Sequence, residues 1–175
     1  MNRRTNEPPL PEPLGYFLTW STYGAWLPGD ERGWTEYRHG WKPPDPIRKL
    51  EAEARMTENH CLLDSEQRRL AEQTIADHCR IRDWRLHAVN CRSNHVHVVV
   101  SAGAPPQRIQ VQFKAWCTRR LKELERRQCD FRETGSPIRE EWWAERGSRR
   151  WINDNESLEM AILYVRDYQD QPRTH

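Results

Sequence analysis

The sequence predicts an α+β fold, in which helices pack on a central antiparallel β-sheet, and three observations lead to this prediction. Short runs near 16–20, 84–91 and 95–102 alternate in polarity or are rich in aromatic and β-branched residues, as strands are. Longer segments between and after these runs carry apolar residues at a spacing of three and four, which is typical of helices. The last two runs are separated by a short turn, so we expect them to pair as an antiparallel hairpin.

The chain is expected to begin with a tail and to continue as one domain. Residues 1–14 are rich in proline and polar side chains, so we expect them to be extended or disordered, with the domain over 15–171. The first strand lies in the segment YFLTWSTYGAWL and ends near the Pro-Gly-Asp turn at 28–30. Residues 30–62 carry glycines, prolines and charges without periodicity, which predicts a long functional loop.

Two histidines stand at the start of a strand that is expected to be central in the sheet. The segment WRLHAVNC and the segment HVHVVVSA form the predicted hairpin, and His95 and His97 open its second strand. Residues i and i+2 of a strand share a face and lie about 6.6 Å apart at Cα. Both imidazoles therefore point the same way and can converge on one divalent metal ion.

Two helices are expected on either side of this hairpin. Asp64 can cap the first, with Gln67 completing a capping box, and the helix should span about 65–82. The second follows a Pro-Pro pair, and its apolar positions are expected at Ile109, Phe113, Trp116, Arg120, Leu121 and Leu124. Its basic residues, which include Lys114 and Arg119, are expected on the exposed sides, where they are either simply solvated or follow a phosphate backbone.

A third helix is expected to follow Asn155. Trp151 and Ile152 read as a short strand or edge, and Asn155 is expected to cap the helix that follows. Its buried stripe is expected at Leu158, Ala161, Ile162 and Val165. Just before it, Arg149 and Arg150 are plausible phosphate contacts, although ion pairs with Glu140, Glu141 or Glu145 explain them equally well.

Tyr164 lies just off the apolar stripe of this third helix, so its ring can lean on the sheet. A lone helical tyrosine is usually structural, but beside a His-x-His site a bound Mg²⁺ or Mn²⁺ makes a phosphate electrophilic enough for a phenol to attack. Two histidines rarely complete a site for such cations, so a third, oxygen ligand is expected. Our candidate is Gln169, about 140° from Tyr164 around an ideal helix; Asp167 and Asp170 compete with it, and Tyr168 is a rival nucleophile.

The composition favours contact with nucleic acid. Only four of the 28 basic residues are lysines, and arginine forks onto phosphates and stacks on bases. Nine tryptophans add flat surfaces, which suits single-stranded or irregular nucleic acid. An ion-paired surface over a Trp-rich core explains the same composition equally well.

Several other classes of protein are disfavoured. The five cysteines are odd in number, unevenly spaced and without a Cys-x-x-Cys pair, which argues against a zinc knuckle or a disulfide framework. No stretch approaches the length of about 18 apolar residues that a membrane span needs, and the N-terminal segment has no apolar core of a signal peptide. We therefore expect a reduced, cytoplasmic protein that does not bind membranes.

Three segments resemble the single-tyrosine HUH transposases, especially the branch of REP-associated tyrosine transposases. The segment YFLTWSTYGAWLPGD is similar to the opening strand and loop of that branch, NHVHVVV to its His-hydrophobic-His strand, and ERGSRRWINDNESLEMAILYVRDYQ to the segment that leads into its nucleophile helix. The resemblance implies a ferredoxin-like HUH nuclease fold with helices on both sides of the sheet, His95 and His97 as metal ligands, and Tyr164 as the nucleophile. Many relatives carry Gln or Asn four residues after the tyrosine, where this sequence has Tyr168, with Gln169 one position later.

The resemblance also implies an activity. It implies a metal-dependent single-stranded DNA endonuclease and strand transferase, a transposase that recognises a DNA hairpin at repetitive palindromic sequences and cuts beside it through a 5′-phosphotyrosine intermediate. The implied cofactor is Mg²⁺ or Mn²⁺, and the implied partner is single-stranded or hairpin DNA, bound by a monomer or a homodimer. A catalytically retired protein that binds hairpin DNA or regulates through it is the alternative that the displaced Gln169 favours. A histidine phosphoesterase would need a second His-x-Thr/Ser motif, which the sequence lacks.

Overall fold

A four-stranded antiparallel sheet forms the framework of the protein. The computed structural model describes residues 12–36, 38–132 and 137–167. The strand order is β4-β5-β1-β6, with neighbouring strands antiparallel throughout, and the strands are β4 (Arg85–Cys91), β5 (His95–Ser101), β1 (Gly15–Ser21) and β6 (Ser148–Ile152). The predicted α+β class and the predicted hairpin are confirmed, and the strand with both histidines is an interior strand, as expected.

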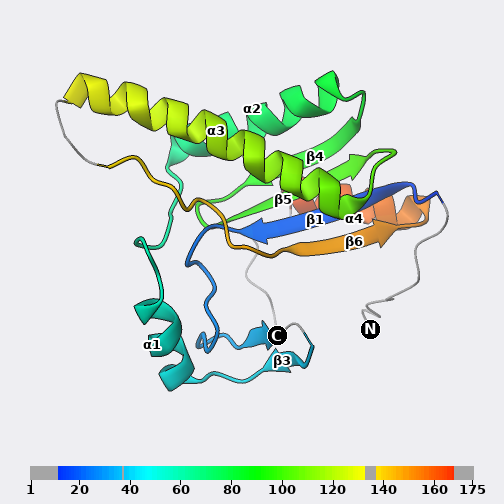
Figure 1. Cartoon of the computed structure of the whole chain (residues 1–175). Helices are drawn as coiled ribbons and strands as arrows, with labels where there is room; N and C mark the ends of the chain where they lie inside the picture. Colours follow the sequence, from blue (N-terminus) through cyan, green and yellow to red (C-terminus); the bar gives the residue numbers. More distant parts are fainter. Residues whose placement is uncertain (1–11, 37, 133–136, 168–175) are drawn as a thin grey trace.

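Helices cover both faces of this sheet (Figure 1). Helices α2 (Ser65–Ile81) and α3 (Pro106–Arg132) lie on one face, and α4 (Asn155–Asp167) lies on the other. The first face buries alternate strand residues against the two helices, namely Tyr16, Leu18, Trp20, Val96, Val98 and Val100 packed with Ile75, Phe113 and Leu121. Burial of each large side chain of this kind contributes about 1.5–3 kcal/mol, so this layer is the main core.

The opposite face has a smaller apolar cluster at one end and polar residues at the other. Val99 and Ile152 of the sheet pack against Ala161 and Val165 of α4, with Phe17 and the expected residues Leu158 and Ile162 partly buried around them. The predicted buried stripe of the third helix is therefore confirmed. Because strand side chains alternate, the same face carries His95 and His97 beyond this cluster.

Local signals account for where the helices begin. The Asp64 carboxylate accepts the backbone N–H of Gln67 at 2.8 Å, and the Gln67 side chain accepts the backbone N–H of Asp64 at 3.0 Å. The predicted capping box and the predicted helix over 65–82 are thus confirmed to within one residue. The expected cap of α4 is wrong by one position, because Asp154 rather than Asn155 accepts the backbone N–H of Ser157, at 2.7 Å.

The buried stripe of α3 differs from the expected one at two positions. Trp116 and Arg120 are exposed, and Cys117 is fully buried between them. A cysteine packs in a core as a small hydrophobe, and its spacing of four from Phe113 and from Leu121 continues the stripe. Trp116 instead lies at the edge of the helix under the guanidinium of Arg119.

Residues 24–60 form a small lobe that hangs from the end of β1, on the side of the sheet away from α2 and α3 (Figure 1). The prediction of a long loop here is wrong, because the lobe contains β2 (Trp34–Glu36), β3 (Gly40–Lys42) and α1 (Pro46–Ala54). Strands of three residues are too short to show a period, so the sequence pattern did not reveal them. Helix α1 did carry a signal, since Asp45 caps it and Pro46 occupies its first position.

Four of the five cysteines are packed in the interior of the protein. All five cysteines are free thiols, and burial raises the pKa of Cys79 and of Cys91 to about 12. Buried thiols of this kind are inert packing groups. None of the helices in the described residues is both long and apolar enough to cross a membrane.

Candidate active site

His95 and His97 lie side by side on the face of the sheet that α4 covers. Their ring centroids are 4.8 Å apart, and the two ring planes are inclined at 77°. His97 pairs in register with Thr19 on β1 and with Asn90 on β4, while His95 pairs with Ser21 at the end of β1. Both histidines are therefore held by an interior strand with neighbours on both sides, which is a rigid support for a site.

Each imidazole has a polar neighbour at its Nδ1 atom. The Thr19 hydroxyl lies 2.7 Å from Nδ1 of His97, and the side-chain oxygen of Asn94 lies 2.7 Å from Nδ1 of His95. When Nδ1 carries the proton and donates it to such an oxygen, the lone pair is on Nε2. Histidines that bind metals are oriented in this way by a second group, so Thr19 and Asn94 are suited to orient the pair.

Burial keeps both imidazoles in the neutral form. His97 is only 8% exposed, and burial, with help from His95 and Arg92, lowers its pKa to about 4. Burial and the charge of Arg92 also lower the pKa of His95. A neutral imidazole offers its lone pair to a cation without first losing a proton, so the pair has the donor chemistry of two metal ligands.

Tyr164 of α4 packs directly against His97. Its ring centroid lies 5.7 Å from that of His97 and 5.9 Å from that of Phe17, with edge-to-face geometry in both cases. Phe17 in turn stacks on His97 at 5.5 Å. Helix α4 is fixed at this point because the Asn90 side chain donates a hydrogen bond to the carbonyl of Val165 at 3.1 Å.

Tyr164 remains accessible in spite of these ring contacts. It is 38% exposed, whereas its helix neighbours Ala161 and Val165 are buried. The ring therefore leans on the sheet while part of it faces solvent, as its place just off the apolar stripe predicts. The Tyr164 ring thus lies beside His97 with part of its surface open to solvent.

The expected third metal ligand is not among the described residues. Gln169, Asp170 and the rival nucleophile Tyr168 lie outside them. Asp167 is described, and it is exposed in the last turn of α4. No group of three or more His, Cys, Asp or Glu side chains suited to a metal ion occurs within 12–36, 38–132 and 137–167.

The four basic residues expected to contact DNA are spread over both faces of the sheet. Arg150 is exposed, and its guanidinium lies 5.4 Å from the ring of Phe17, next to the histidine face. Arg149 points to the other face, where it donates a hydrogen bond to Gln110 at 3.2 Å. Of these two arginines, Arg150 is the one that the structure brings close to the histidine pair.

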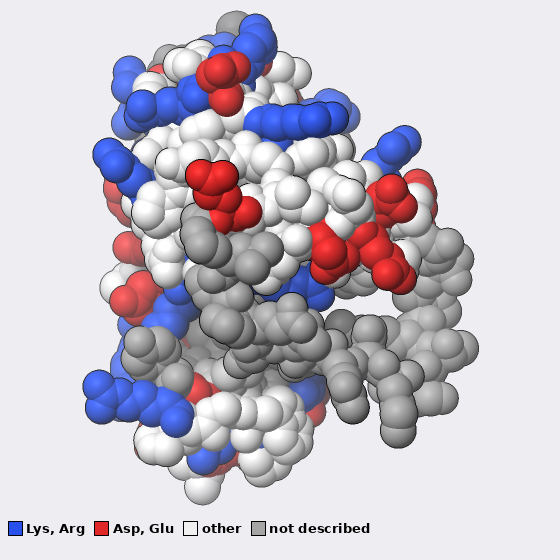
Figure 2. Space-filling view, turned by 90° about the vertical axis from the view of Figure 1, so that its right-hand side faces the viewer, with Lys and Arg blue, Asp and Glu red and all other residues white. Residues whose placement is uncertain are grey.

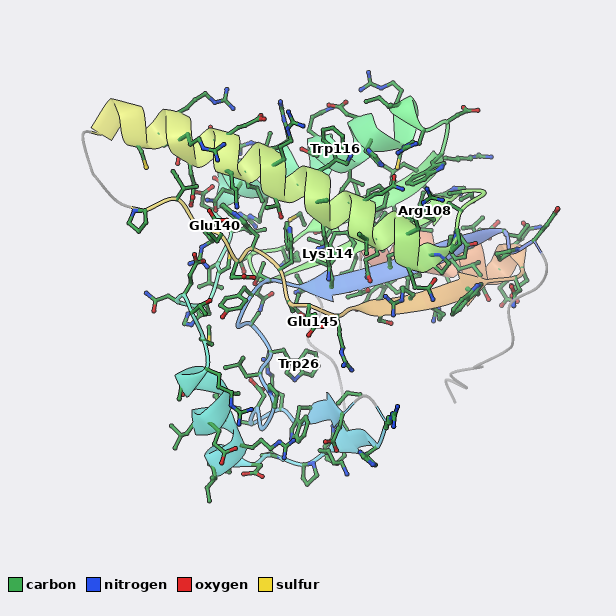
Figure 3. All side chains as sticks on the ribbon, viewed as in Figure 1. Trp26, Arg108, Lys114, Trp116, Glu140 and Glu145 are labelled. Atoms are coloured by element: carbon green, nitrogen blue, oxygen red, sulfur yellow. The ribbon has the colours of Figure 1, made fainter. Side chains whose placement is uncertain are left out.

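The remaining two lie on α3, on the far side of the sheet. Lys114 was expected on an exposed side, but its ammonium points inward and donates to the backbone carbonyls of Ala144 at 2.8 Å, Arg146 at 3.1 Å and Glu145 at 3.2 Å (Figure 3). Burial lowers the pKa of Lys114 to about 8. Arg119 is exposed over the ring of Trp116 and pairs with Glu123.

The sequence reasoning did not find the residues that support the histidines. Phe17 and Thr19 alternate with the core residues of β1, so the pattern placed them on the opposite face but gave no partner for them. Asn94 stood in the predicted turn before His95. Its position directly before a His-x-His strand was the one local signal that Asn94 orients His95.

The comparisons with known proteins give structural similarity without similarity in sequence. No family model and no curated protein matches the sequence. Among solved structures, the chain is similar to a REP-associated tyrosine transposase bound to a REP hairpin, with a TM-score of 0.45 and 11% sequence identity, over 94% of this chain and 70% of that chain. At this identity and TM-score the similarity assigns neither a family nor an activity.

Proposed function

We propose that this protein is a metal-dependent single-stranded DNA endonuclease and strand transferase, a transposase that cuts beside a DNA hairpin through Tyr164. The observation that carries the proposal is the cluster of His95, His97 and Tyr164 rings on one face of the sheet. Two neutral imidazoles beside an accessible phenol are two of the metal donors and the nucleophile that such a reaction needs. The segments that resemble REP-associated tyrosine transposases contain all three residues.

The metal ion would be Mg²⁺ or Mn²⁺. His95 and His97 would hold it through Nε2, and Gln169, Asp167 or Asp170 would supply the oxygen ligand. When bound, such an ion polarises a nonbridging phosphate oxygen and stabilises the charge that develops on it. The orientation of the two rings by Thr19 and Asn94 supports this assignment.

The chemical step is a transesterification, in which the phosphorus atom exchanges its ester bond to a 3′ oxygen of the DNA for an ester bond to Tyr164. The phenolic oxygen of Tyr164 loses its proton and attacks the phosphorus atom, and the bond from phosphorus to the 3′ oxygen breaks. The upstream strand leaves with a 3′ hydroxyl, which takes up the proton, and the downstream strand stays linked through its 5′ phosphate to Tyr164. The covalent link keeps the energy of the broken ester, so a new 3′ hydroxyl can reverse the attack and complete strand transfer.

The basic residues support binding of DNA on two sides of the sheet. Arg150 lies at the histidine face, where it can contact the phosphates of the strand to be cut. Helix α3 carries eight basic and three acidic residues, and Figure 2 shows Lys and Arg side chains gathered at the top of the molecule, where α2 and α3 lie. Arg119 and Arg149 belong to this second side, which we assign to the phosphates of the hairpin stem. We leave Lys114 out of this set, because its ammonium is bound to three backbone carbonyls.

A covalent-adduct assay tests the proposal. The full chain is incubated with Mn²⁺ and a hairpin DNA with a single-stranded flank labelled at its 3′ end, so that the label stays on the fragment that tyrosine captures. We expect a labelled protein band on a denaturing gel, absent for Tyr164→Phe and retained for the matched variant Tyr168→Phe. Loss of the band in Tyr168→Phe alone would assign the nucleophile to the rival tyrosine and overturn our assignment.

A catalytically retired hairpin-binding or regulatory protein is the second candidate. The position of Gln169, one residue later than in many relatives, favours it. In the same assay, this candidate predicts that the wild-type chain shifts the hairpin on a native gel and forms no adduct with either Mg²⁺ or Mn²⁺.

A further inference from the structure

The lobe presents two large indole rings to solvent. Trp26 is 53% exposed and Trp41 is 67% exposed. Tryptophan has a large apolar side chain that is usually buried in large part. Two exposed indoles in one small lobe therefore indicate a surface that binds a ligand or a partner. Nothing in the main core requires them, since the lobe lies outside the layers formed by the sheet and its helices (Figure 1).

Both rings are fixed in place by the same glycine. The indole N–H of Trp26 donates a hydrogen bond to the carbonyl of Gly33 at 2.8 Å. The ring of Trp41 lies against the α-carbon of Gly33, because a methyl group built there would be 2.5–2.7 Å from three of its ring atoms. Gly33 has a φ of +78°, so the backbone also favours glycine at this position.

An arginine adds a second contact to one of these rings. The guanidinium of Arg32 lies 5.1 Å from the centroid of Trp26. Arg32 is itself held by two hydrogen bonds to the carboxylate of Asp30, at 2.7 and 3.1 Å, and by one to the carbonyl of Ala25 at 2.9 Å. Exposed rings that are already ordered lose little conformational freedom when a flat ligand stacks on them.

The lobe is connected to the histidine end of the sheet. It begins three residues after Ser21, the residue that pairs with His95. A hollow of about 720 Å³ lies mainly within the lobe, where Ala25, Lys49 and Glu53 line it, and it reaches the sheet at Asn94, next to His95. Figure 3 shows Trp26 between the sheet and the rest of the lobe, below the segment of Glu145.

We propose that Trp26 and Trp41 form a stacking surface for unpaired nucleobases of the single strand that reaches the histidine site. The choice of DNA as the ligand rests on the proposed function. Stacking on aromatic side chains is the main source of sequence-tolerant affinity for single strands. A paired duplex keeps its bases covered by their neighbours, so this surface selects the unpaired flank rather than the hairpin stem.

The charges around the lobe favour stacking over phosphate attraction as the source of affinity. Asp30 pairs with Arg32, and the single carboxylate of Glu36 lies near both Lys42 and Arg48. Over residues 24–60 the sequence has seven acidic and six basic residues, so the lobe carries no excess of positive charge. Loss of an indole should lower the affinity without changing the slope of affinity against salt concentration, which reports phosphate contacts.

Fluorescence anisotropy with labelled single strands tests this inference. Trp41→Ala and Trp26→Phe are compared with wild type in the Tyr164→Phe background without divalent metal, so that cleavage plays no part. The probes are a single strand of about ten nucleotides and the same backbone with abasic sites, which keeps the phosphates and removes the bases. Trp116→Ala is the matched control, because Trp116 is also exposed under an arginine but lies on the far face.

We expect the protein with both rings to bind the normal strand more tightly than the abasic strand. Each stacked base should contribute a factor of about ten to this preference. Trp41→Ala should lose the share of this preference that its own ring contributes, about tenfold, with an unchanged salt slope. Trp26→Phe, which keeps an aromatic ring, and Trp116→Ala should retain most of the preference. Circular dichroism and thermal melting show whether each variant is folded.

Three results overturn the inference. They are equal binding of the normal and abasic strands by wild type, an equal loss of preference in Trp116→Ala, and light scattering that shows Trp41→Ala breaking a dimer without affecting DNA. The proposed cleavage activity is judged separately by the covalent adduct. A protein that stacks bases but forms no adduct keeps this inference and loses the enzymatic proposal.

Discussion

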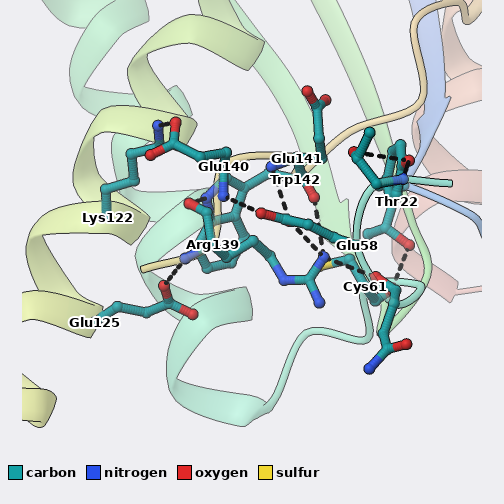
Figure 4. A network of polar contacts seen from close by, with 12 residues as sticks. Thr22, Glu58, Cys61, Lys122, Glu125, Arg139, Glu140, Glu141 and Trp142 are labelled. Atoms are coloured by element: carbon teal, nitrogen blue, oxygen red, sulfur yellow. Dashed lines mark hydrogen bonds and ion pairs between the residues drawn. The ribbon is translucent and has the colours of Figure 1, made fainter. Parts of the chain in front are cut away.

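Glu58 attaches the returning end of the lobe to the body of the protein, so its replacement should loosen the lobe (Figure 4). Its carboxylate accepts the backbone N–H groups of Glu140 at 2.9 Å and of Glu141 at 3.1 Å, and a hydrogen bond from Arg139 at 3.3 Å. Arg139 also donates to the carbonyl of Asn59 at 2.9 Å. One side chain thus joins segments that are about eighty residues apart in the sequence.

The change Glu58→Gln keeps the size of the side chain and removes one of the two acceptor oxygens. Hydrogen bonds to a charged group contribute about 1.5–3 kcal/mol each when buried. The Glu58 side chain is 26% exposed, so solvent weakens these contacts, and we expect a total loss of about 2–3 kcal/mol. For a chain of this length, that corresponds to a fall in Tm of about 4–12 °C.

The loss should depend on pH in a defined direction. Burial raises the pKa of Glu58, but the N–H groups of Glu140 and Glu141 and the charges of Arg139 and Lys122 outweigh it, so the pKa lies below its ordinary value of 4.5. A carboxyl with a lowered folded-state pKa stabilises the fold fully above its ordinary pKa and loses that contribution as the pH falls through the folded-state value. The difference between wild type and Glu58→Gln should therefore be constant near neutral pH and shrink below about pH 4.5.

Urea unfolding at a series of pH values measures this difference. Glu51→Gln on the exposed side of α1 is the matched control, because it removes an acidic charge from the same lobe. The reasoning is refuted if Glu58→Gln lowers the free energy of unfolding no more than Glu51→Gln does at pH 7. It is also refuted if the difference between wild type and Glu58→Gln is as large at pH 3 as at pH 7.

Three further predictions follow from single contacts. Lys114→Met leaves three carbonyls without their donor and should lower the free energy of unfolding by about 2–4 kcal/mol in urea titrations; a change below 1 kcal/mol would contradict its structural role. Asp64→Ala removes the cap of α2 and should cost about 1 kcal/mol by the same measurement, with Asp64→Asn close to wild type. Thr19→Val removes the hydroxyl beside His97 and should weaken Mn²⁺ binding about tenfold by calorimetry, while Ser21→Ala on the same strand face should not.

The elements that the sequence predicts correctly are those whose signals are local. The hairpin of β4 and β5 follows from a period of two, and α2 follows from a capping box with apolar residues at helical spacing. The paired histidines belong to this group, because two positions on one strand fix their shared face. The lobe was missed because its strands have three residues each and its one helix has nine.

The contacts between parts of the site that come from different elements could not be predicted. Thr19 and His97 are 78 positions apart in the sequence, and only the register between β1 and β5 brings them together. A single sequence gives the alternation along a strand but not the partner across it. The packing of Tyr164 on Phe17 and His97 depends in the same way on how α4 crosses the sheet.

The core and the candidate site depend on the same strand register. Along β1, Leu18 and Trp20 enter the main core, while Phe17 and Thr19 point to the histidines. A slip of one residue between β1 and β5 would send the apolar residues to the site and the site residues into the core. Burial of two large side chains opposes such a slip by about 3–6 kcal/mol, which is more than the hydrogen bond of Thr19 contributes. The geometry of the candidate site is therefore fixed mainly by apolar packing on the opposite face of the sheet.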